Sequence, residues 1–180
     1  MSGDVRPRRG LLIGRFQPFH RGHLAVIQWA RAQHPEEWLI LGIGSAQESH
    51  TTANPFTAGE RWEMIAAGLS EAHVDRWVAF PIPDIQRHAQ WVAYVRTLLP
   101  AFDRIYTNNP LTRMLFDEAH IPVEAPPMEQ RETWQGASIR QRMAKRQSWE
   151  AAVPPAVLAY LQSIRAPERL RLLTPDPRAG

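Results

Sequence analysis

Arg15, His20 and His23 lie close together near the start of the chain. They follow a short apolar run over 10–13 and precede a stretch with helical spacing of apolar residues, so the pattern predicts a strand, a loop and then a helix. In an open α/β sheet, ligands bind beyond the carboxyl ends of the strands, and the N-terminus of a helix favours a phosphate group. Imidazole and guanidinium groups at this place predict a site for a phosphorylated ligand.

His20 and His23 are three residues apart, so both project from nearly the same side of a helix that begins near Arg21. Gly22 between them has no Cβ and lets a phosphate approach the backbone. Each residue alone is more simply a solvated polar group, but together they fit a His-x-Gly-His signature of nucleotidyl transfer. A zinc site is the weaker alternative, because two histidines supply only two ligands. We therefore expect no metal held by the protein itself.

A second candidate phosphate site follows near the other end of the chain. Ser138 and Gln141 have the spacing of a capping box, which predicts a helix that begins at Ser138. Arg140 and Arg142 would then lie in the first turn, where a cation opposes the helix dipole unless an anion offsets it. Arginines at two helix starts that face one cleft would hold a triphosphate.

The elements that must position these residues alternate in the manner of a parallel α/β sheet. Strands are expected over 10–13, 38–43, 76–80, 104–107 and 123–125, and helices over 22–33, 57–69, 89–99 and 110–119. Thr57 with Glu60 has the form of a capping box, and Asn109-Pro110 that of a capped helix with proline at its first position. Beyond Pro126 only helices are expected, over 138–145 and 153–164.

The predicted fold is therefore a Rossmann-like open parallel sheet flanked by helices, with a helical C-terminal part. No repeat or linker divides the chain, so we expect a single domain over 1–180, with flexible ends at 1–9 and 174–180.

The composition excludes several classes of protein. The 180 residues include no cysteine, which removes disulfides, thiolate metal sites and cysteine nucleophiles and fits a reducing compartment. Lys145 is the single lysine, and its sequence context suits neither a Walker phosphate loop nor a pyridoxal Schiff base. A net charge of +3 does not demand nucleic acid, and no apolar run is long enough to span a membrane. We expect a cytoplasmic protein that binds neither nucleic acid nor a membrane.

From about Gly10 to Leu172 the sequence resembles the archaeal-type nicotinamide-nucleotide adenylyltransferases. Seven segments match that family in order, namely 14–23 (GRFQPFHRGH), 42–47 (GIGSAQ), 54–61 (NPFTAGER), 81–85 (PIPDI), 91–94 (WVAY), 109–111 (NPL) and 139–143 (IRQRM). The His-x-Gly-His piece marks only the nucleotidyltransferase superfamily, whereas the segments from 42 and from 54 narrow the resemblance to this group.

The resemblance implies transfer of the adenylyl group of ATP to nicotinamide mononucleotide, giving NAD and pyrophosphate, with Mg²⁺ carried by ATP. It implies catalytic roles for Arg15, His20, His23 and Arg140. It also implies ATP contacts by Gly14, Phe16, Asn109 and Ser138, and nicotinamide-nucleotide contacts by Asp84 and Trp91. Indole is a good partner for the cationic pyridinium ring, so Trp91 is expected to stack on it. Because family members are commonly hexamers, a homo-oligomer is expected.

Three departures from the family pattern bear on the site. Ala137 stands where relatives usually carry a hydroxyl, and Thr107-Asn108 replaces a common Ser-Gly. His88 stands where asparagine is frequent, which leaves open the preference between the amidated and the deamidated mononucleotide. Two other functions stay open: an adenylyltransferase for another phosphorylated acceptor, such as phosphopantetheine, and a nucleotide-binding regulator without turnover.

Overall fold

The computed structural model describes residues 6–127 and 134–174 of the chain. Within these residues, five parallel strands form one sheet in the order β3-β2-β1-β4-β5. The strands are β1 (Arg9–Gly14), β2 (Trp38–Gly44), β3 (Trp77–Ile82), β4 (Arg104–Tyr106) and β5 (Val123–Glu124). Each lies within two residues of its predicted position, which confirms the Rossmann-like open parallel sheet.

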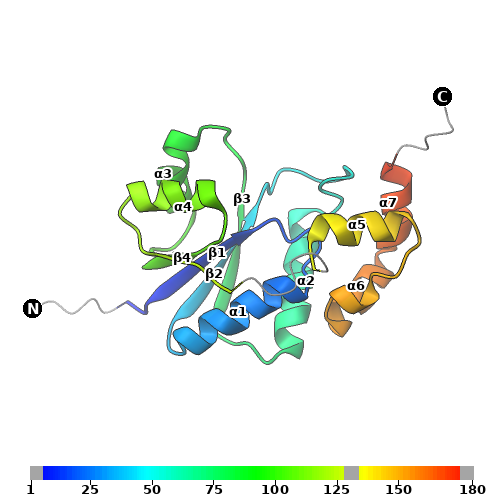
Figure 1. Cartoon of the computed structure of the whole chain (residues 1–180), viewed down its shortest axis with the longest axis horizontal. Coiled ribbons are helices and arrows are strands. Elements are labelled where there is room, and N and C mark those ends of the chain that lie inside the picture. The colour runs from blue at the N-terminus through cyan, green and yellow to red at the C-terminus, as the bar shows by residue number, and fades with distance from the viewer. Residues whose placement is uncertain (1–5, 128–133, 175–180) are drawn as a thin grey trace, which may run out of the picture.

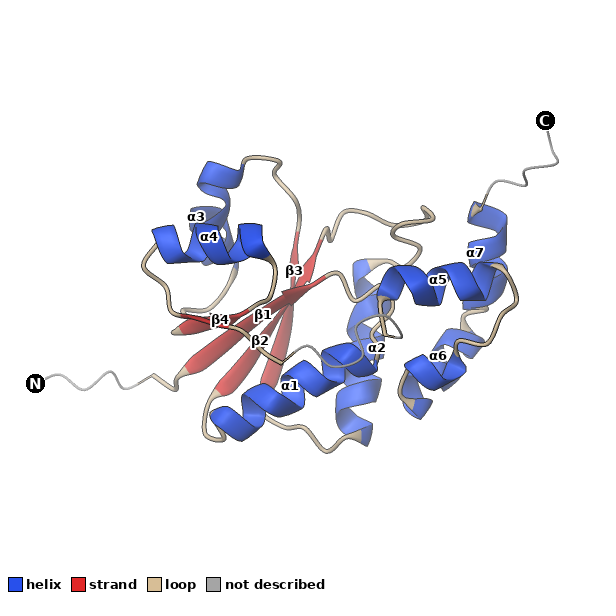
Figure 2. Cartoon of the chain, viewed as in Figure 1, coloured by secondary structure: helices blue, strands red, loops and turns tan. Residues whose placement is uncertain are grey.

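Helices cover both faces of the sheet (Figures 1 and 2). One face carries α1 (Arg21–Gln33) and α2 (Ala58–Glu71), and the other carries α3 (His88–Leu98) and α4 (Pro110–Glu118). Successive strand residues point to opposite faces, so Leu39 and Leu41 of β2 join one core cluster and Ile40 joins the other. The buried run of β2 is therefore apolar throughout, as parallel strands covered on both sides require.

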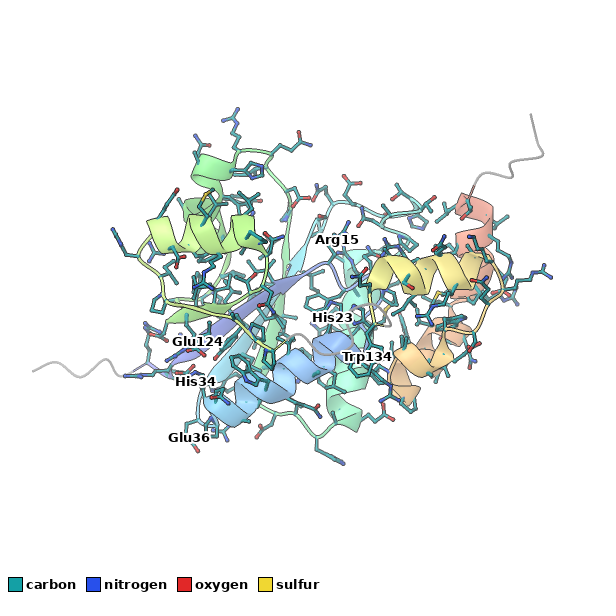
Figure 3. The ribbon with its side chains drawn as sticks, viewed as in Figure 1. Arg15, His23, His34, Glu36, Glu124 and Trp134 are labelled. Atoms are coloured by element: carbon teal, nitrogen blue, oxygen red, sulfur yellow. The ribbon has the colours of Figure 1, made fainter. Side chains whose placement is uncertain are left out.

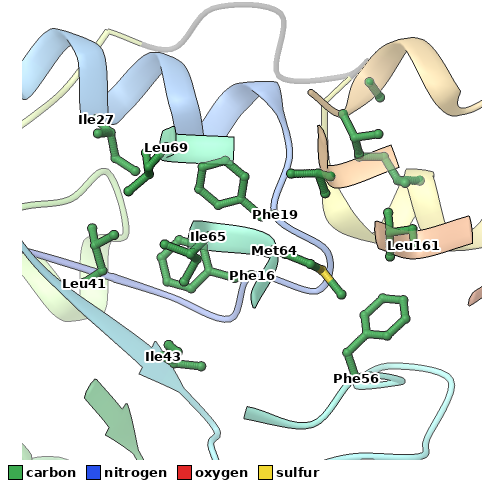
Figure 4. Close-up of a cluster of buried hydrophobic side chains, with 14 of the residues drawn as sticks. Phe16, Phe19, Ile27, Leu41, Ile43, Phe56, Met64, Ile65, Leu69 and Leu161 are labelled. Carbon is green, nitrogen blue, oxygen red and sulfur yellow. The ribbon is translucent and has the colours of Figure 1, made fainter. Parts of the chain in front are cut away.

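The C-terminal part is helical, as predicted, and it extends the first of these core clusters. It comprises α5 (Gly136–Ala144), a short 3₁₀ helix (Glu150–Ala152), α6 (Pro155–Ser163) and α7 (Ala166–Leu173). Leu161 of α6 packs in the same buried cluster as Phe19, Phe56 and Met64, and Figure 4 shows these side chains together. The C-terminal helices are thus held against α2 and the loop that follows β1.

Two helix starts confirm their predicted caps. The Thr57 hydroxyl accepts from the backbone N–H of Glu60, whose carboxylate accepts from the Thr57 N–H in return. The Asn109 side chain accepts from the N–H of Thr112, with Pro110 at the first position of α4. Each cap satisfies N–H groups that the helix itself leaves unpaired.

One prediction for the C-terminal part is wrong, and one helix was not predicted. The fifth helix begins at Gly136, two residues before Ser138, so Ser138 is not its cap and Arg140 is in its second turn. Helix α7 was not predicted, and Arg165, in the left-handed conformation with φ of 52°, separates it from α6. A bidentate ion pair between Arg169 and Glu60 fastens α7 to α2.

The described parts of both predicted flexible ends make contacts, and at the C-terminal end the Thr174 hydroxyl donates to the backbone oxygen of Leu170 at 2.8 Å. Arg6 forms a bidentate ion pair with Asp103, and Arg9 begins β1. Residues 1–5 and 175–180 lie outside the described residues. Within the described ranges, none of the helices has the length and apolar character that a membrane crossing needs.

Candidate active site

The strand order changes direction between β1 and β4, since β2 and β3 follow on one side of β1 and β4 and β5 on the other. Open α/β sheets bind ligands in the crevice outside the carboxyl ends of the strands at such a point. A cavity of about 460 Å³, which we call the first cavity, lies there. Its lining comes from the ends of β1 and β4, from α1 and from the start of α5: Arg15, His20, Gly22, His23, Ala25, Val26, Asn108, Pro127, Trp134, Gln135, Gly136 and Ala137.

Figure 3 shows Arg15, His23 and Trp134 near the N-terminal end of α1, where α5 also begins. His34 and Glu124 lie at the opposite end of α1 in the same view, where Nε2 of His34 is 3.0 Å from a carboxylate oxygen of Glu124. His34 therefore lies at the far end of α1, away from the first cavity.

The two histidines of the first cavity lie against each other at the start of α1. Their ring centroids are 3.7 Å apart, and the rings are inclined by 24°. The backbone N–H of His20 donates to Nδ1 of His23 at 3.3 Å. A neutral His23 with an accepting Nδ1 carries its proton on Nε2, so Nε2 is a hydrogen-bond donor. Phe16 and Phe19 pack against the His23 ring at centroid distances of 4.7 and 5.6 Å and fix its orientation.

Both imidazoles are neutral near pH 7. Burial, together with the nearby Arg140 guanidinium, lowers the pKa of His20 to about 4. Burial and the neighbouring His20 hold the pKa of His23 well below its ordinary value. Each ring thus offers one N–H to a ligand without having to gain a proton first.

These depressed pKa values predict a pH dependence of stability. Below about pH 6.5 the unfolded chain protonates His20 and His23, whereas the folded protein does not until about pH 4 for His20. The unfolded state therefore binds more protons in this window, and the free energy of unfolding should fall as pH is lowered from 7 to 5. When urea unfolding is measured at both pH values, the free energy of unfolding should fall less for His20→Asn than for the natural protein. Equal falls would contradict the assigned protonation state.

Three arginines surround the loop between β1 and α1 without a carboxylate within ion-pair distance among the described residues. Arg15 is exposed at the first cavity. Arg140 is 8% exposed and donates to the backbone oxygens of Gln17 (2.7 Å) and Thr52 (3.2 Å). Arg61 is fully buried and donates to backbone oxygens. Burial, with Arg15 nearby, lowers the pKa of Arg61 and of Arg140 to about 10, so both stay charged at neutral pH.

A second cavity, of about 350 Å³, lies beside the first, at the starts of α3 and α4. It is lined by Asp84, Ile85, Gln86, Arg87, His88, Trp91, Asn109, Leu111, Thr112 and Leu115. The Trp91 ring meets Phe116 edge to face at 5.7 Å, which holds one edge of the indole against the core. The remaining surface of Trp91 lines the cavity as a flat apolar wall.

The structure brings Arg15, His20 and His23 together in the first cavity and Asp84 and Trp91 in the second. Arg140 lies behind the first cavity, where a Cβ on Gly136 would come within 3.3 Å of its Nη1.

The remaining residues that were predicted to contact ATP lie in different surroundings. Asn109 lines the second cavity, and its neighbour Asn108 lines the first. The Phe16 side chain is buried in the core, beneath a Gly14 on which a Cβ would lie 3.1 Å from the Phe16 ring. Ser138 lines neither cavity, and Arg142 donates to the backbone oxygens of Ser138 and Ser148.

Sequence reasoning missed Gln17, Arg61 and Trp134. The Gln17 amide both donates to and accepts from the backbone of Phe56, at 2.8 and 3.0 Å, and so joins the loop after β1 to the start of α2. Gln17 and Arg61 stand inside two of the matched segments, but only tertiary contacts identify their partners. Trp134 precedes the matched segment 139–143 and carries no signal of its own.

The chain matches the cytidylyltransferase-like family model over residues 11–142. Curated proteins named nicotinamide-nucleotide adenylyltransferase match over nearly the whole chain. That of Thermoplasma volcanium is 46% identical over 95% of this chain and 95% of its own length. That of Methanosphaerula palustris is 49% identical over 91% of this chain and 95% of its own length.

Solved structures share the fold. A bifunctional NMN adenylyltransferase/ADP ribose pyrophosphatase from Francisella tularensis, complexed with AMP and a manganese ion, superposes with a TM-score of 0.76 at 21% identity. The match covers 93% of this chain, which spans about half (52%) of that protein. A putative nicotinate-nucleotide adenylyltransferase from Vibrio parahaemolyticus has a TM-score of 0.61 at 14% identity and is covered over 99% of its length.

Proposed function

Because the chain belongs to the nicotinamide-nucleotide adenylyltransferases, within the cytidylyltransferase-like family, we propose that its first cavity binds ATP and its second cavity the mononucleotide. The enzyme transfers the adenylyl group of ATP to nicotinamide mononucleotide and forms NAD and pyrophosphate. In this reaction a phosphate oxygen of the mononucleotide attacks the α-phosphorus of ATP. The bond from that phosphorus to the oxygen bridging the α- and β-phosphates breaks, and pyrophosphate leaves.

The unpaired positive charge beside the first cavity carries this proposal. Arg15, Arg61 and Arg140 are charged, two of them are buried, and none has a carboxylate partner within the described residues. Uncompensated buried charge is costly, and the cost falls when an anion of opposite charge binds. The start of α1 adds free N–H groups on the same side. A triphosphate offers the opposite charge.

The chemistry then reduces to alignment and charge stabilisation. The attacking phosphate oxygen is already ionised near neutral pH, so no general base is needed. Neutral His20 and His23 donate hydrogen bonds to the charge that grows on the α-phosphate oxygens and the leaving group. Arg15 contacts the phosphates directly. Arg140 lies behind the first cavity, where its charge stabilises the phosphates and its hydrogen bond to the Gln17 backbone holds the loop.

The second cavity supplies what a nicotinamide ribotide needs. The indole of Trp91 stacks on the cationic pyridinium ring, and Asp84 lines the same cavity. His88, which stands where relatives frequently carry asparagine, also lines this cavity.

A divalent cation accompanies ATP in this proposal, with Mg²⁺ as our expectation. Among the described residues no three His, Asp or Glu side chains form a metal-binding group, so the donor set suits a cation held mainly by phosphate oxygens. Such a cation neutralises part of the triphosphate charge. A hexameric assembly, a single domain over 1–180 and a cytoplasmic location are further proposals, which rest on the family and the sequence.

Initial rates of pyrophosphate release test the function. Purified protein with ATP, Mg²⁺ and nicotinamide mononucleotide should release pyrophosphate and form an equal amount of NAD, measured by chromatography. Turnover with phosphopantetheine in place of the mononucleotide would assign another acceptor. Tight ATP binding without product for any acceptor would make the protein a nucleotide-binding regulator.

A further inference from the structure

Arg61 is the largest fully buried side chain of the protein's described residues, and it is a cation. It stands in the first turn of α2, one residue after the capping glutamate Glu60. Its partners are all backbone oxygens. Nη1 donates to Gly44 at 2.7 Å and to Arg15 at 3.0 Å, and Nη2 donates to Ser45 at 3.2 Å.

These oxygens belong to the two loops that leave the carboxyl ends of β1 and β2. Phe16, directly after Arg15, has φ of 50°, and Ser45 has φ of 48°, so both loops turn through the left-handed region with side chains that disfavour it. A guanidinium that binds both loops at once fixes the two turns relative to each other.

The second of these loops continues to the second cavity. The side-chain Oε1 of Gln47 accepts from the backbone N–H of Asp84 at 2.9 Å, and the backbone N–H of Ala46 donates to the backbone oxygen of Ile82 at 3.1 Å. One path of bonds therefore runs from the Arg15 backbone through Arg61 to the loop 44–47, and from Gln47 to Asp84. Arg15 lines the first cavity and Asp84 the second.

We propose that Arg61 is a positioning residue that sets the first cavity in register with the second, and so aligns the α-phosphate with the attacking phosphate. The inference rests on the proposed function, because it assigns ATP to one cavity and the mononucleotide to the other. Arg61 touches neither substrate. Replacing its guanidinium with another cation should leave the binding of each substrate alone nearly unchanged and should reduce the rate at which the two react.

Arg61→Lys keeps the buried charge but cannot span both loops with a planar fork. We expect kcat to fall about tenfold or more, since small misplacement of reacting groups is costly. The Kd of ATP and the Kd of the mononucleotide, each measured alone by calorimetry, should change less than about threefold, because direct contacts are kept. Arg31→Lys is the matched control. Arg31 also donates to a backbone oxygen, that of Glu37, but at the far end of α1, and its variant should keep the kcat of the natural protein.

Gln47→Met tests the same path at an exposed position and does not depend on the folding of the Arg61 variant. It should lower kcat about threefold. In the double variant the two losses should be less than multiplicative, as expected for residues that act through one segment.

The outcomes are distinct. Absence of NAD formation by the natural protein would refute the proposed function. If the natural protein is active, an unchanged kcat in Arg61→Lys would overturn the positioning role. A loss of activity that disappears at saturating ATP would overturn it too, because weaker ATP binding would then explain the whole loss. If Arg61→Lys does not fold, an unchanged kcat in Gln47→Met would overturn it as well.

Discussion

Replacing His23 by asparagine should lower kcat by about 10²- to 10³-fold, the loss expected for one preorganised hydrogen-bond donor in the transition state. The geometry gives the reason. Nδ1 of His23 accepts from the His20 backbone, so the proton is on Nε2, and the burial of the ring keeps it neutral. An asparagine oxygen can take the place of Nδ1 as the acceptor, but nothing then donates from the position of Nε2.

Asparagine is a better test than alanine at this position. The His23 ring packs against Phe16 and Phe19, so alanine would also leave a cavity in the core. His73→Asn is the matched control, because His73 is exposed at the end of α2 with φ of 52°, which asparagine tolerates. Steady-state rates at saturating ATP and mononucleotide give kcat. An asparagine variant with the kcat of the control would remove His23 from the mechanism.

Arg15→Ala should raise the KM for ATP about 10- to 100-fold, the range expected for the loss of a hydrogen bond to a charged group. Arg15 is exposed, and its side chain has no hydrogen-bond or ion-pair partner within the described part of the chain. The substitution should therefore leave the urea midpoint nearly unchanged. Removing the charge should also make ATP binding less sensitive to salt, because one fewer ionic contact is screened.

Arg76→Ala is the control for Arg15, since Arg76 is a partly exposed arginine that lies at the amino end of β3, away from the first cavity, and pairs with Glu36. It should not change the KM for ATP. Steady-state rates of both variants give the KM for ATP, and isothermal titration with ATP at two salt concentrations gives the Kd and its salt dependence. Equal affinities in the two variants would show that Arg15 does not contact the phosphates.

The sheet and the local signals around it were predictable from the sequence because they depend on short-range patterns. Buried strands read as short apolar runs, and capping residues such as Thr57 and Asn109 satisfy N–H groups only a few residues away. The cluster of Arg15, His20 and His23 was predictable for the same reason, since one strand, one loop and one helix start contain it.

The parts that were not predicted depend on contacts between distant segments. The sequence pattern predicts that Arg61 is an ordinary surface arginine of a helix. Its burial depends on carbonyl partners in the loops after β1 and β2, which the pattern does not indicate. Arg140 was predicted at a helix start, but α5 begins two residues earlier and turns its side chain toward Gln17 and Thr52. Ser138 has capping-box spacing without the cap, because spacing alone does not fix where a helix begins.

A crystal structure with a non-hydrolysable ATP analogue and nicotinamide mononucleotide tests most directly that Arg15, His20 and His23 form the triphosphate site. The triphosphate should lie at the start of α1, with Nε2 of His23 within hydrogen-bond distance of an α-phosphate oxygen and the pyridinium ring on Trp91. A triphosphate seated away from both histidines, with Arg15 in solvent, would contradict the account.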